Sequence, residues 1–372
     1  MKIPTFALER YFAQHEFTAR YLLSCSDCEA LSMNALLDMA DAESLSLWEN
    51  LELHYTESQG HPVLRESIAD IYENIDKSNI LVAAPEEAIF LFMHALLEAD
   101  DHVVVMTPAY QSLHEVARSI GCAVDCWEPS GESDWHFDVG SLEAKLRPDT
   151  RLVVINFPHN PTGYLPSRDD LHAIVEMTQN RGIYLLADEM YRFLETDPDT
   201  TLPAACELYE NAVSLFGLSK SFGLPGLRIG WLASQNKDIL ARALALKDYT
   251  TICNSAPSEI LGIMGVRNRA KIVESQLQRL RKNLSVLDRF FDDYDDLFRW
   301  SRPCGSSVGF PEMLIGQDTS EFCDELVKKA GIMLVPSKLF QFGERHVRIG
   351  FGRDNLPEVI SVFAKYLDEN YR

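Results

Sequence analysis

Short apolar runs recur through the middle of the chain, and most of them show no alternation of apolar and polar residues. Runs of this kind are typical of strands that are buried on both faces of a sheet. Between them, apolar residues recur at helical spacing. This alternation of strands and helices predicts an α/β fold with a mainly parallel sheet. The expected strands are Ile80–Ala83, His102–Met106, Ala123–Trp127, Leu152–Asn156, Ile183–Ala187, Ala212–Phe216 and Gly230–Ala233, and the expected helices include Glu86–Leu97, Ser112–Ile120 and Arg168–Asn180.

The C-terminal part of the chain has a different pattern. A long amphipathic stretch predicts a helix with a break near Asn268, and short strands and a closing helix follow it. A chain of 372 residues is too long for one ordinary hydrophobic core, so two domains are expected. We expect a large α/β domain over residues 40–255, and a smaller α+β domain built from residues 1–39 and 256–372. The C-terminal elements expected are a helix over Ser258–Phe291, strands over Ser307–Phe310, Ile332–Val335 and Arg345–Ile349, and a helix over Leu356–Asn370.

Charge and hydropathy restrict the possible partners. The chain has 34 Lys and Arg against 56 Asp and Glu, a formal net charge of −22. Such a surface repels phosphate backbones and anionic lipids, so nucleic-acid and membrane partners are not expected. No apolar run is as long as a membrane-spanning helix, and the first residues lack the pattern of a secretion signal. We therefore expect a cytoplasmic protein.

The cysteines do not predict a metal site. Of the eight Cys, only Cys25 and Cys28 form a C-x-x-C pair. A structural zinc site needs about four ligands, and neither a second pair nor a histidine cluster supplies the others. No metal cofactor is expected.

Polar residues with distinctive chemistry follow the expected strands in order. Asn160 begins an Asn-Pro-Thr-Gly turn after one buried strand. Asp188 comes at the end of the next strand, with Tyr191 three residues on. Lys220 follows the strand after that, and Arg228 lies eight residues beyond Lys220. The carboxyl ends of parallel strands are where α/β folds place ligands, so these side chains are expected to meet.

The order and spacing of these five residues resemble the class I/II aminotransferase family. Its members are fold-type I enzymes that use pyridoxal 5'-phosphate (PLP), with a large, mainly parallel α/β domain and a smaller α+β domain. The resemblance extends from about Tyr55 to Arg348. It implies that Lys220 holds PLP as a Schiff base and shuttles the proton between the substrate α-carbon and the cofactor. A lysine must be a neutral amine to form an imine, so the site has to favour that form.

The resemblance also implies how the ring of the cofactor is held. Asp188 is expected to pair with the protonated pyridine nitrogen, which keeps the ring an electron sink. Tyr191 and Asn160 are expected to hydrogen-bond the phenolate oxygen, and Tyr110 to stack on the ring. Viewed alone, Asp188 could instead be a helix N-cap, and Tyr110 could be an ordinary core tyrosine.

The phosphate-binding segment departs from the family pattern. Arg228 and Ser219 are expected to bind the phosphate, together with the backbone amides of Ala84 and Glu86 at a helix N-terminus. Pro85 has no N–H to offer, and Glu86 brings a negative charge, so we expect its carboxylate to turn away. A Ser or Thr that often binds phosphate in the family is replaced here by glycine, at residue 217.

Three further expectations come from the resemblance. Arg348 is expected to bind the substrate α-carboxylate, with Asn160 close by. The Asn160–Pro161 peptide bond is expected to be cis. Tyr55 and the segment Tyr249–Ser258 match parts that lie at a subunit interface in the family, which predicts a homodimer with shared active sites.

The expected activity is transfer of an amino group between an L-amino acid and a 2-oxo acid. No second arginine suggests a dicarboxylic substrate, and the substrate is left open. An alternative keeps the cofactor but changes the reaction to that of a lyase or cyclase, of the cystathionine lyase or capreomycidine synthase type. The same cofactor residues serve both reactions, so the motifs do not separate them. A third alternative, a PLP-binding regulatory domain on DNA, is disfavoured by the acidic charge.

Overall fold

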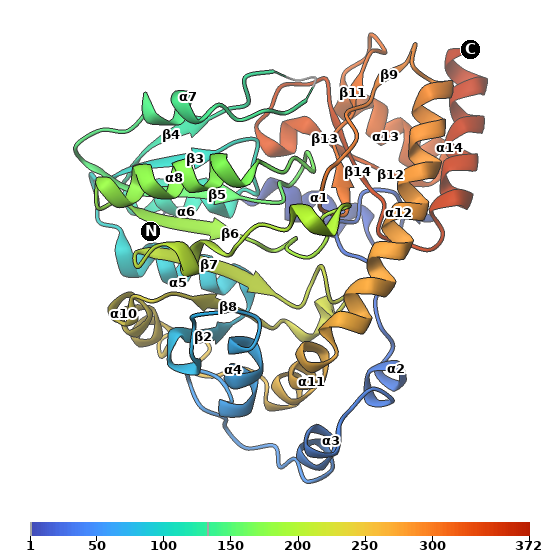
Figure 1. The fold of residues 1–372 in the computed structure, drawn as a ribbon. Helices are drawn as coiled ribbons and strands as arrows, with labels where there is room; N and C mark the ends of the chain where they lie inside the picture. The colour runs from blue at the N-terminus through green and yellow to red at the C-terminus, as the bar shows by residue number, and fades with distance from the viewer. Residues whose placement is uncertain (1, 132–133) are drawn as a thin grey trace.

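The computed structural model describes residues 2–131 and 134–372. Met1, the first residue of the expected small domain, lies outside the described residues. A seven-stranded sheet occupies the large part of the molecule, in the order β2-β8-β7-β6-β5-β3-β4 (Figure 1). Its strands are β2 (Ile80–Ala83), β3 (His102–Met106), β4 (Ala123–Trp127), β5 (Thr150–Asn156), β6 (Tyr184–Asp188), β7 (Ala212–Gly217) and β8 (Gly230–Ala233).

The sheet is mainly parallel, as predicted. Neighbouring strands run parallel from β7 across β6, β5 and β3 to β4. The exception is β8, which is antiparallel to both β7 and β2. A short segment with one 3-10 turn, η3 (Pro225–Leu227), joins β7 to β8. Without a crossover helix the chain has to reverse its direction there.

Helices cover both faces of this sheet because successive strand residues point to opposite faces. Val103 and Val105 of β3 pack with α5, α6 and α10, whereas Val104 and Met106 pack with α7 and α8. Both sets are buried, which explains why these strands read as continuous apolar runs. The helices of this part are α4 (Pro62–Ala69), α5 (Pro85–Leu96), α6 (Ser112–Ile120), α7 (Val139–Glu143), α8 (Arg168–Asn180), α9 (Ala205–Leu208) and α10 (Lys237–Lys247), with 3-10 turns η1 (Lys77–Asn79) and η2 (Pro198–Thr200).

The C-terminal part contains the long helical stretch, divided as expected at Asn268 into α11 and α12. The Asn268 side chain donates to the carbonyl oxygens of Met264 and Met39, so the break is held by hydrogen bonds. The predicted strand over residues 332–335 is wrong in one respect, because it forms two short strands, β12 and β13, in different sheets. The helices here are α11 (Ala256–Arg267), α12 (Arg269–Asp293), α13 (Thr319–Ala330) and α14 (Leu356–Tyr371), with the turn η4 (Ser337–Phe340).

Short strands join the N-terminal segment to this C-terminal part. β1 (Tyr21–Leu22) pairs in parallel with β12 (Ile332–Met333). β14 (Val347–Gly350) lies between β10 (Val308–Gly309) and β13 (Val335–Pro336). The remaining elements are α1 (Ala7–His15), α2 (Met33–Leu37), α3 (Ala42–Glu49) and the β9 (Phe298–Arg299) and β11 (Glu312–Met313) pair. The division into two domains stays a prediction.

Within the part of the chain that the structure describes, no helix combines the length and apolar character needed to cross a membrane.

Candidate active site

A cavity of about 530 Å³ lies at the carboxyl ends of three neighbouring parallel strands. Asn160 follows β5, Asp188 ends β6, and Ser219 and Lys220 follow β7. The structure thus brings together residues that are far apart in the sequence, at the edge where α/β sheets bind ligands. The predicted site residues in its lining are Glu86, Tyr110, Asn160, Asp188, Tyr191, Ser219, Lys220, Arg228 and Arg348.

Two predicted site residues do not line this cavity. Ala84 is the residue before α5, and its place in the phosphate site stays a prediction. Tyr55 is 83 % exposed, so it contributes nothing to the cavity of its own chain. This position agrees with a role in a neighbouring subunit but does not test it.

Lys220 is partly buried, and its Nζ donates a hydrogen bond to Oγ of Ser26 at 2.8 Å. The same Nζ lies 6.0 Å from the centre of the Tyr191 ring. Its surroundings are therefore those of a site residue and not of a freely solvated surface lysine. Ser26 lies in the loop after β1, in the N-terminal part of the chain.

Asp188 is a buried carboxylate with no cation at ion-pair distance among residues 2–131 and 134–372. Its side chain is among the buried polar groups, and its Oδ1 accepts from the backbone N–H of Met190 at 3.1 Å. Burial raises the pKa of Asp188 to about 7, and the positive charge of Lys220 opposes part of that rise. A turn and not a helix directly follows β6, so the N-cap interpretation is wrong. A cationic ring nitrogen would supply the missing charge.

Arg348 presents the opposite case, a buried cation without a carboxylate. The residue is 1 % exposed, and its Nη2 and Nη1 donate to the Ser24 carbonyl oxygen at 2.9 Å and to Oδ1 of Asn160 at 3.3 Å. Its Nε has no hydrogen-bond partner in the part of the chain that the structure describes, and burial lowers the pKa of its guanidinium group. Among the described residues no acidic side chain lies within ion-pair distance of it. An unneutralised guanidinium in a cavity is suited to bind an anion.

Asn160 connects this arginine to the sheet. The Asn160–Pro161 bond is cis, as predicted, and the Asn160 N–H donates to Oδ1 of Asn156 at 2.8 Å. The same Asn156 side chain donates to the Asp188 carbonyl oxygen at 2.8 Å. These bonds hold the Asn160 side chain beside Arg348.

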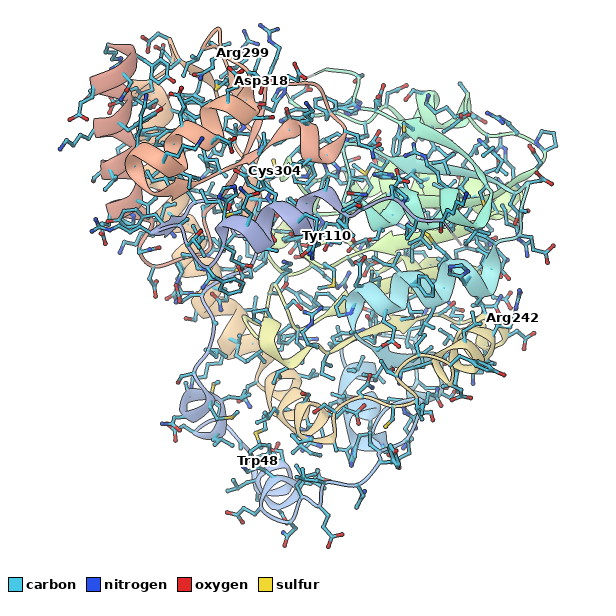
Figure 2. All side chains as sticks on the ribbon, turned by 180° about the vertical axis from the view of Figure 1, so that it is seen from behind. Trp48, Tyr110, Arg242, Arg299, Cys304 and Asp318 are labelled. Carbon is cyan, nitrogen blue, oxygen red and sulfur yellow. The ribbon has the colours of Figure 1, made fainter. Side chains whose placement is uncertain are left out.

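Tyr110 lies below α1 (Figure 2). Its hydroxyl donates to Oε1 of Glu9 at 2.6 Å, and its ring lies 5.0 Å from that of Phe6. Burial raises the pKa of the Tyr110 phenol well above its ordinary value. The ring is only partly buried in the core and faces the cavity, where it can contact a bound ring.

Hydrogen-bond donors line the side of the cavity where the phosphate is expected. Ser219 is 5 % exposed, and no described residue forms a hydrogen bond with its Oγ. Arg228 is exposed at the cavity edge, and its Nη1 donates to the Pro225 carbonyl oxygen. Both are suited to a phosphate group.

The two departures in the phosphate segment are physically connected. Pro85 packs on the paired glycines Gly217 and Gly230 of β7 and β8. A Cβ atom on Gly217 would lie 3.3 Å from Cγ of Pro85 and 3.0 Å from Cα of Gly230, and one on Gly230 would lie 2.8 Å from Cγ of Pro85. A Ser or Thr at residue 217 would therefore require the Pro85 ring and the neighbouring backbone to move by a few tenths of an ångström.

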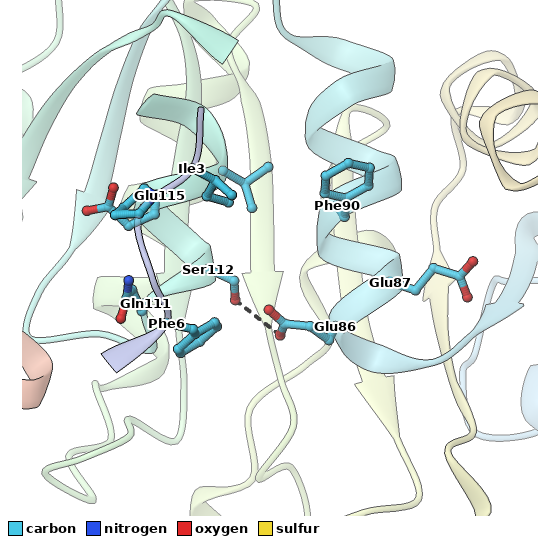
Figure 3. Close-up of a pocket in the computed structure, with 10 residues that line it drawn as sticks. Ile3, Phe6, Glu86, Glu87, Phe90, Gln111, Ser112 and Glu115 are labelled. Carbon is cyan, nitrogen blue, oxygen red and sulfur yellow. Dashed lines mark hydrogen bonds between the residues drawn. The ribbon is translucent and has the colours of Figure 1, made fainter. Parts of the chain in front are cut away.

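Glu86 does not turn out of the cavity, but it is held to one side. Its Oε2 accepts a hydrogen bond from Oγ of Ser112 at 3.2 Å, which Figure 3 shows. Burial raises the pKa of Glu86 to about 7, so its negative charge is weakened at neutral pH. Glu86 also lines a second cavity of about 260 Å³ between α5, α6 and the N-terminal segment.

The N-terminal wall of the site was not predicted from the sequence. Phe6, Leu8, Glu9, Phe12 and Glu16 come from α1 and its ends, and Cys25, Ser26 and Asp27 from the loop after β1. No motif marks them, because only the tertiary fold brings them to the cavity. The residues that the structure describes contain no group of three metal-binding side chains.

Comparison with known proteins agrees with this geometry. The family model for aminotransferase class I and II matches residues 26–363. Capreomycidine synthase from Streptomyces vinaceus is 30 % identical over 288 residues, which cover 77 % of this chain and 73 % of that protein. A PLP-dependent aminotransferase from Streptococcus suis has a TM-score of 0.93 at 28 % identity, with 100 % of each chain covered. The PLP-dependent cyclase OrfR has a TM-score of 0.90 at 28 % identity, with 99 % of this chain and 98 % of that chain covered.

The residues in the cavity fit the same cofactor. A buried carboxylate lacks a cation, a buried serine hydroxyl lacks an acceptor, and a lysine amine lies in the same lining. The chain therefore belongs to the class I and II aminotransferase family, and its cofactor is pyridoxal 5'-phosphate.

Proposed function

We propose that the protein is an aminotransferase that moves an amino group from an L-amino acid to a 2-oxo acid. The observation that carries the proposal is one cavity that contains an unneutralised buried carboxylate, Asp188, and an unneutralised buried cation, Arg348, together with Lys220. The first charge suits the cofactor ring, and the second suits the carboxylate that amino acids and 2-oxo acids share.

PLP supplies an electron sink for the bond that breaks at the substrate α-carbon. Lys220 would hold the cofactor through Nζ, and its amine would serve as the base that moves the proton at the substrate α-carbon. Asp188 would stabilise the positive charge on the ring nitrogen. Ser219 and Arg228 would bind the phosphate, and Tyr191 and Asn160 would donate to the ring oxygen.

Arg348 would orient the substrate by its α-carboxylate. Its guanidinium is fixed by the Ser24 carbonyl and by Asn160, so little side-chain freedom is lost when the carboxylate binds. Ser26 accepts a hydrogen bond from Lys220 and keeps the amine directed into the cavity.

The test is an amino-group transfer assay. Purified protein with PLP is incubated with an L-amino acid, with and without a 2-oxo acid. Formation of a new amino acid that depends on the 2-oxo acid supports the proposal. Turnover that releases ammonia without any acceptor contradicts it and favours a lyase.

A cyclase is the second candidate, because relatives with that activity are similar to this chain. The relatives include capreomycidine synthase and the PLP-dependent cyclase OrfR. A cyclase would convert one amino acid into a cyclic product with no acceptor and with no net loss of the amino group. Mass spectrometry of the same reaction mixtures distinguishes that outcome from transfer and from ammonia release.

We also propose that the protein is a homodimer. Leu53, Tyr55, Tyr249 and Ile252 are exposed apolar residues on neighbouring segments, since Nζ of Lys247 bonds to the carbonyl oxygens of both Ser58 and Ile252. Exposed apolar residues that lie together mark association surfaces. The proposal would place Tyr55 at the active site of the partner subunit.

A further inference from the structure

The walls of the active-site cavity are unevenly charged. Its lining contains eight charged residues: Glu9, Glu16, Asp27, Glu86, Asp188, Lys220, Arg228 and Arg348. Asp188, Lys220 and Arg228 are assigned to the cofactor, and Arg348 is assigned to the substrate α-carboxylate. The four charged residues of the lining that remain are all acidic. The cavity is a ligand site on independent grounds, since the 1 % exposed Arg348 has an Nε without a partner there.

Two of these four acidic residues are already accounted for. Asp27 pairs with Arg353, whose Nη2 lies 3.0 and 2.9 Å from the two carboxylate oxygens. Glu86 is bonded to Ser112, on the side of the cavity where the phosphate is expected. This leaves Glu9 and Glu16, both on the N-terminal wall.

The Glu16 side chain lies on the cavity wall without a direct polar partner among the described residues. Its carboxylate has no hydrogen bond and no ion pair within the described residues, and it follows the last residue of α1. A negative charge is unfavourable at a helix C-terminus because of the helix dipole. Burial, followed by repulsion from Asp27 and Glu9, raises the pKa of Glu16, and the positive charges of Arg353 and Lys220 oppose only part of that rise. A bound cation would relieve each of these costs.

Glu9 and Phe12 lie on the same face of α1 as Glu16. Residues three and seven positions apart share one side of a helix, and all three line the cavity. Among the described side chains, Glu9 accepts only from the neutral hydroxyl of Tyr110. The rings of Phe6, Phe12 and Tyr110 lie in the same wall. Carboxylates combined with aromatic faces are a setting that attracts organic cations.

We propose that the substrate amino acid carries a positively charged group, an amine or a guanidine, at the far end of its side chain. Glu16 and Glu9 would receive that group while Arg348 holds the α-carboxylate. This inference rests on the proposed function, because it takes Arg348 and the cofactor residues as assigned there. An acidic side chain would meet repulsion at the same wall, and a neutral one would leave Glu16 without a partner.

The test uses two ligands that differ only in charge. One is 5-guanidinopentanoate, and the other is its neutral counterpart 5-ureidopentanoate. Neither has an α-amino group, so neither can enter the transfer reaction, and binding to the PLP-loaded protein is measured by calorimetry. We expect the guanidino ligand to bind about tenfold more tightly or better, as hydrogen bonds to charged groups typically provide.

The variants Glu16→Gln and Glu9→Gln should each reduce that preference several-fold. The exposed Glu176→Gln on the outer face of α8 removes one charge away from the cavity and should leave the preference unchanged. The preference of the wild type should also weaken as the salt concentration rises. Retained cofactor absorbance and melting temperature identify variants that remain folded. If one of the two glutamine variants does not fold, the other still tests the inference.

Three results would overturn the inference. They are equal or tighter binding of the ureido ligand, a preference that is unchanged in both glutamine variants, and no binding of either ligand. These readouts do not depend on turnover. A failure of the transfer assay with an intact charge preference would therefore count against the proposed function alone.

Discussion

Two buried residues of opposite charge define the site at the scale of single residues. Asp188 and Arg348 come from different parts of the chain, and neither meets a side chain of the opposite charge at ion-pair distance within the described residues. Leaving a charge buried and unpaired is costly, and proteins retain such groups where a ligand supplies the partner. Each charge leads to a separate prediction.

Replacing Arg348 by Ala should weaken amino-acid binding strongly. Truncating one partner of a buried charged pair costs on the order of 2–5 kcal/mol, so the KM for the amino acid should rise by roughly 30-fold or more. Affinity for PLP should change little, because Arg348 is expected to contact only the substrate. The control is Arg345→Ala, since that side chain is 71 % exposed. A KM that stays at the wild-type value in Arg348→Ala would rule out the role.

Replacing Asp188 by Asn should stabilise the cofactor-free protein above neutral pH. The pKa of Asp188 is about 7 in the folded chain and 3.8 ordinarily, so between these values the folded state binds more protons than the unfolded state. The free energy of unfolding therefore falls as pH rises through this window. Above it, Asp188→Asn should be more stable than the wild type by roughly 1–3 kcal/mol.

Denaturant unfolding of both cofactor-free proteins at pH 4 and pH 8 measures this difference. At pH 4 the two should be nearly equal, because Asp188 is largely neutral in the folded wild type. The PLP affinity should move in the opposite direction and be weaker in the variant, because the ring nitrogen loses its anion. If the variant is less stable than the wild type at pH 8, the buried charge of Asp188 does not destabilise the cofactor-free protein, and the prediction is wrong.

The residues that follow the strands could be predicted from the sequence, and the N-terminal wall could not. Asn160, Asp188 and Lys220 each come directly after or at the end of an apolar run, and parallel strands place those ends together. Ser26 and Glu16 have no such relation to the sheet. Their positions depend on how β1 pairs with β12 and how α1 packs, which local patterns do not reveal.

At the scale of elements, the contact of α5 with β7 and β8 explains why the phosphate segment departs from its family. Pro85 is the first residue of α5, where a proline is tolerated because its N–H would have no partner in the helix. Its ring fills the space above Gly217 and Gly230. The three residues therefore form one packing unit.

Gly217→Ala should destabilise the protein by about 1–3 kcal/mol, because the new Cβ meets backbone atoms and the Pro85 ring. In the double variant with Pro85→Ala, part of this loss should be recovered. Unfolding of the single and double variants provides a double-mutant cycle. Gly226→Ala is the matched control, since nothing lies within 4 Å of its added Cβ. Strict additivity of the two changes would show that Pro85 does not limit residue 217.

Element boundaries followed the sequence closely where the pattern was long or fully buried. β3, β4, α6 and α8 have the predicted bounds. The reversed direction of β8 was not predicted, because an apolar run carries no information about direction. The stretch 332–335 was predicted as one strand because its residues are all apolar. The sequence does not reveal that β12 pairs with β1 whereas β13 pairs with β14.

At the scale of the whole molecule, the proposed dimer would place Tyr55 at the active site of the partner subunit, whereas it does not line the cavity of its own chain. The residue is 83 % exposed and lies outside the cavity lining. Sedimentation of the PLP-loaded protein should give the mass of two chains. A monomer would contradict shared active sites.

Hybrid dimers test the sharing directly. Lys220→Ala and Tyr55→Ala chains are produced together, so that mixed dimers form. In a mixed dimer, the chain that retains Lys220 is completed by Tyr55 of the other chain, and one site of wild-type composition results. High-affinity PLP binding and activity should therefore return at a level that neither parent reaches. Activity that only averages the two parents would contradict the arrangement.

The central claim is that Lys220 holds PLP for amino transfer, and an absorbance scan tests it most directly. The purified protein is scanned with PLP, then after an L-amino acid is added, and then after a 2-oxo acid is added. We predict a visible band that shifts to the near ultraviolet with the amino acid and returns with the 2-oxo acid, and that is absent in Lys220→Ala. No visible band with PLP, or the same spectrum in wild type and Lys220→Ala, would contradict the claim.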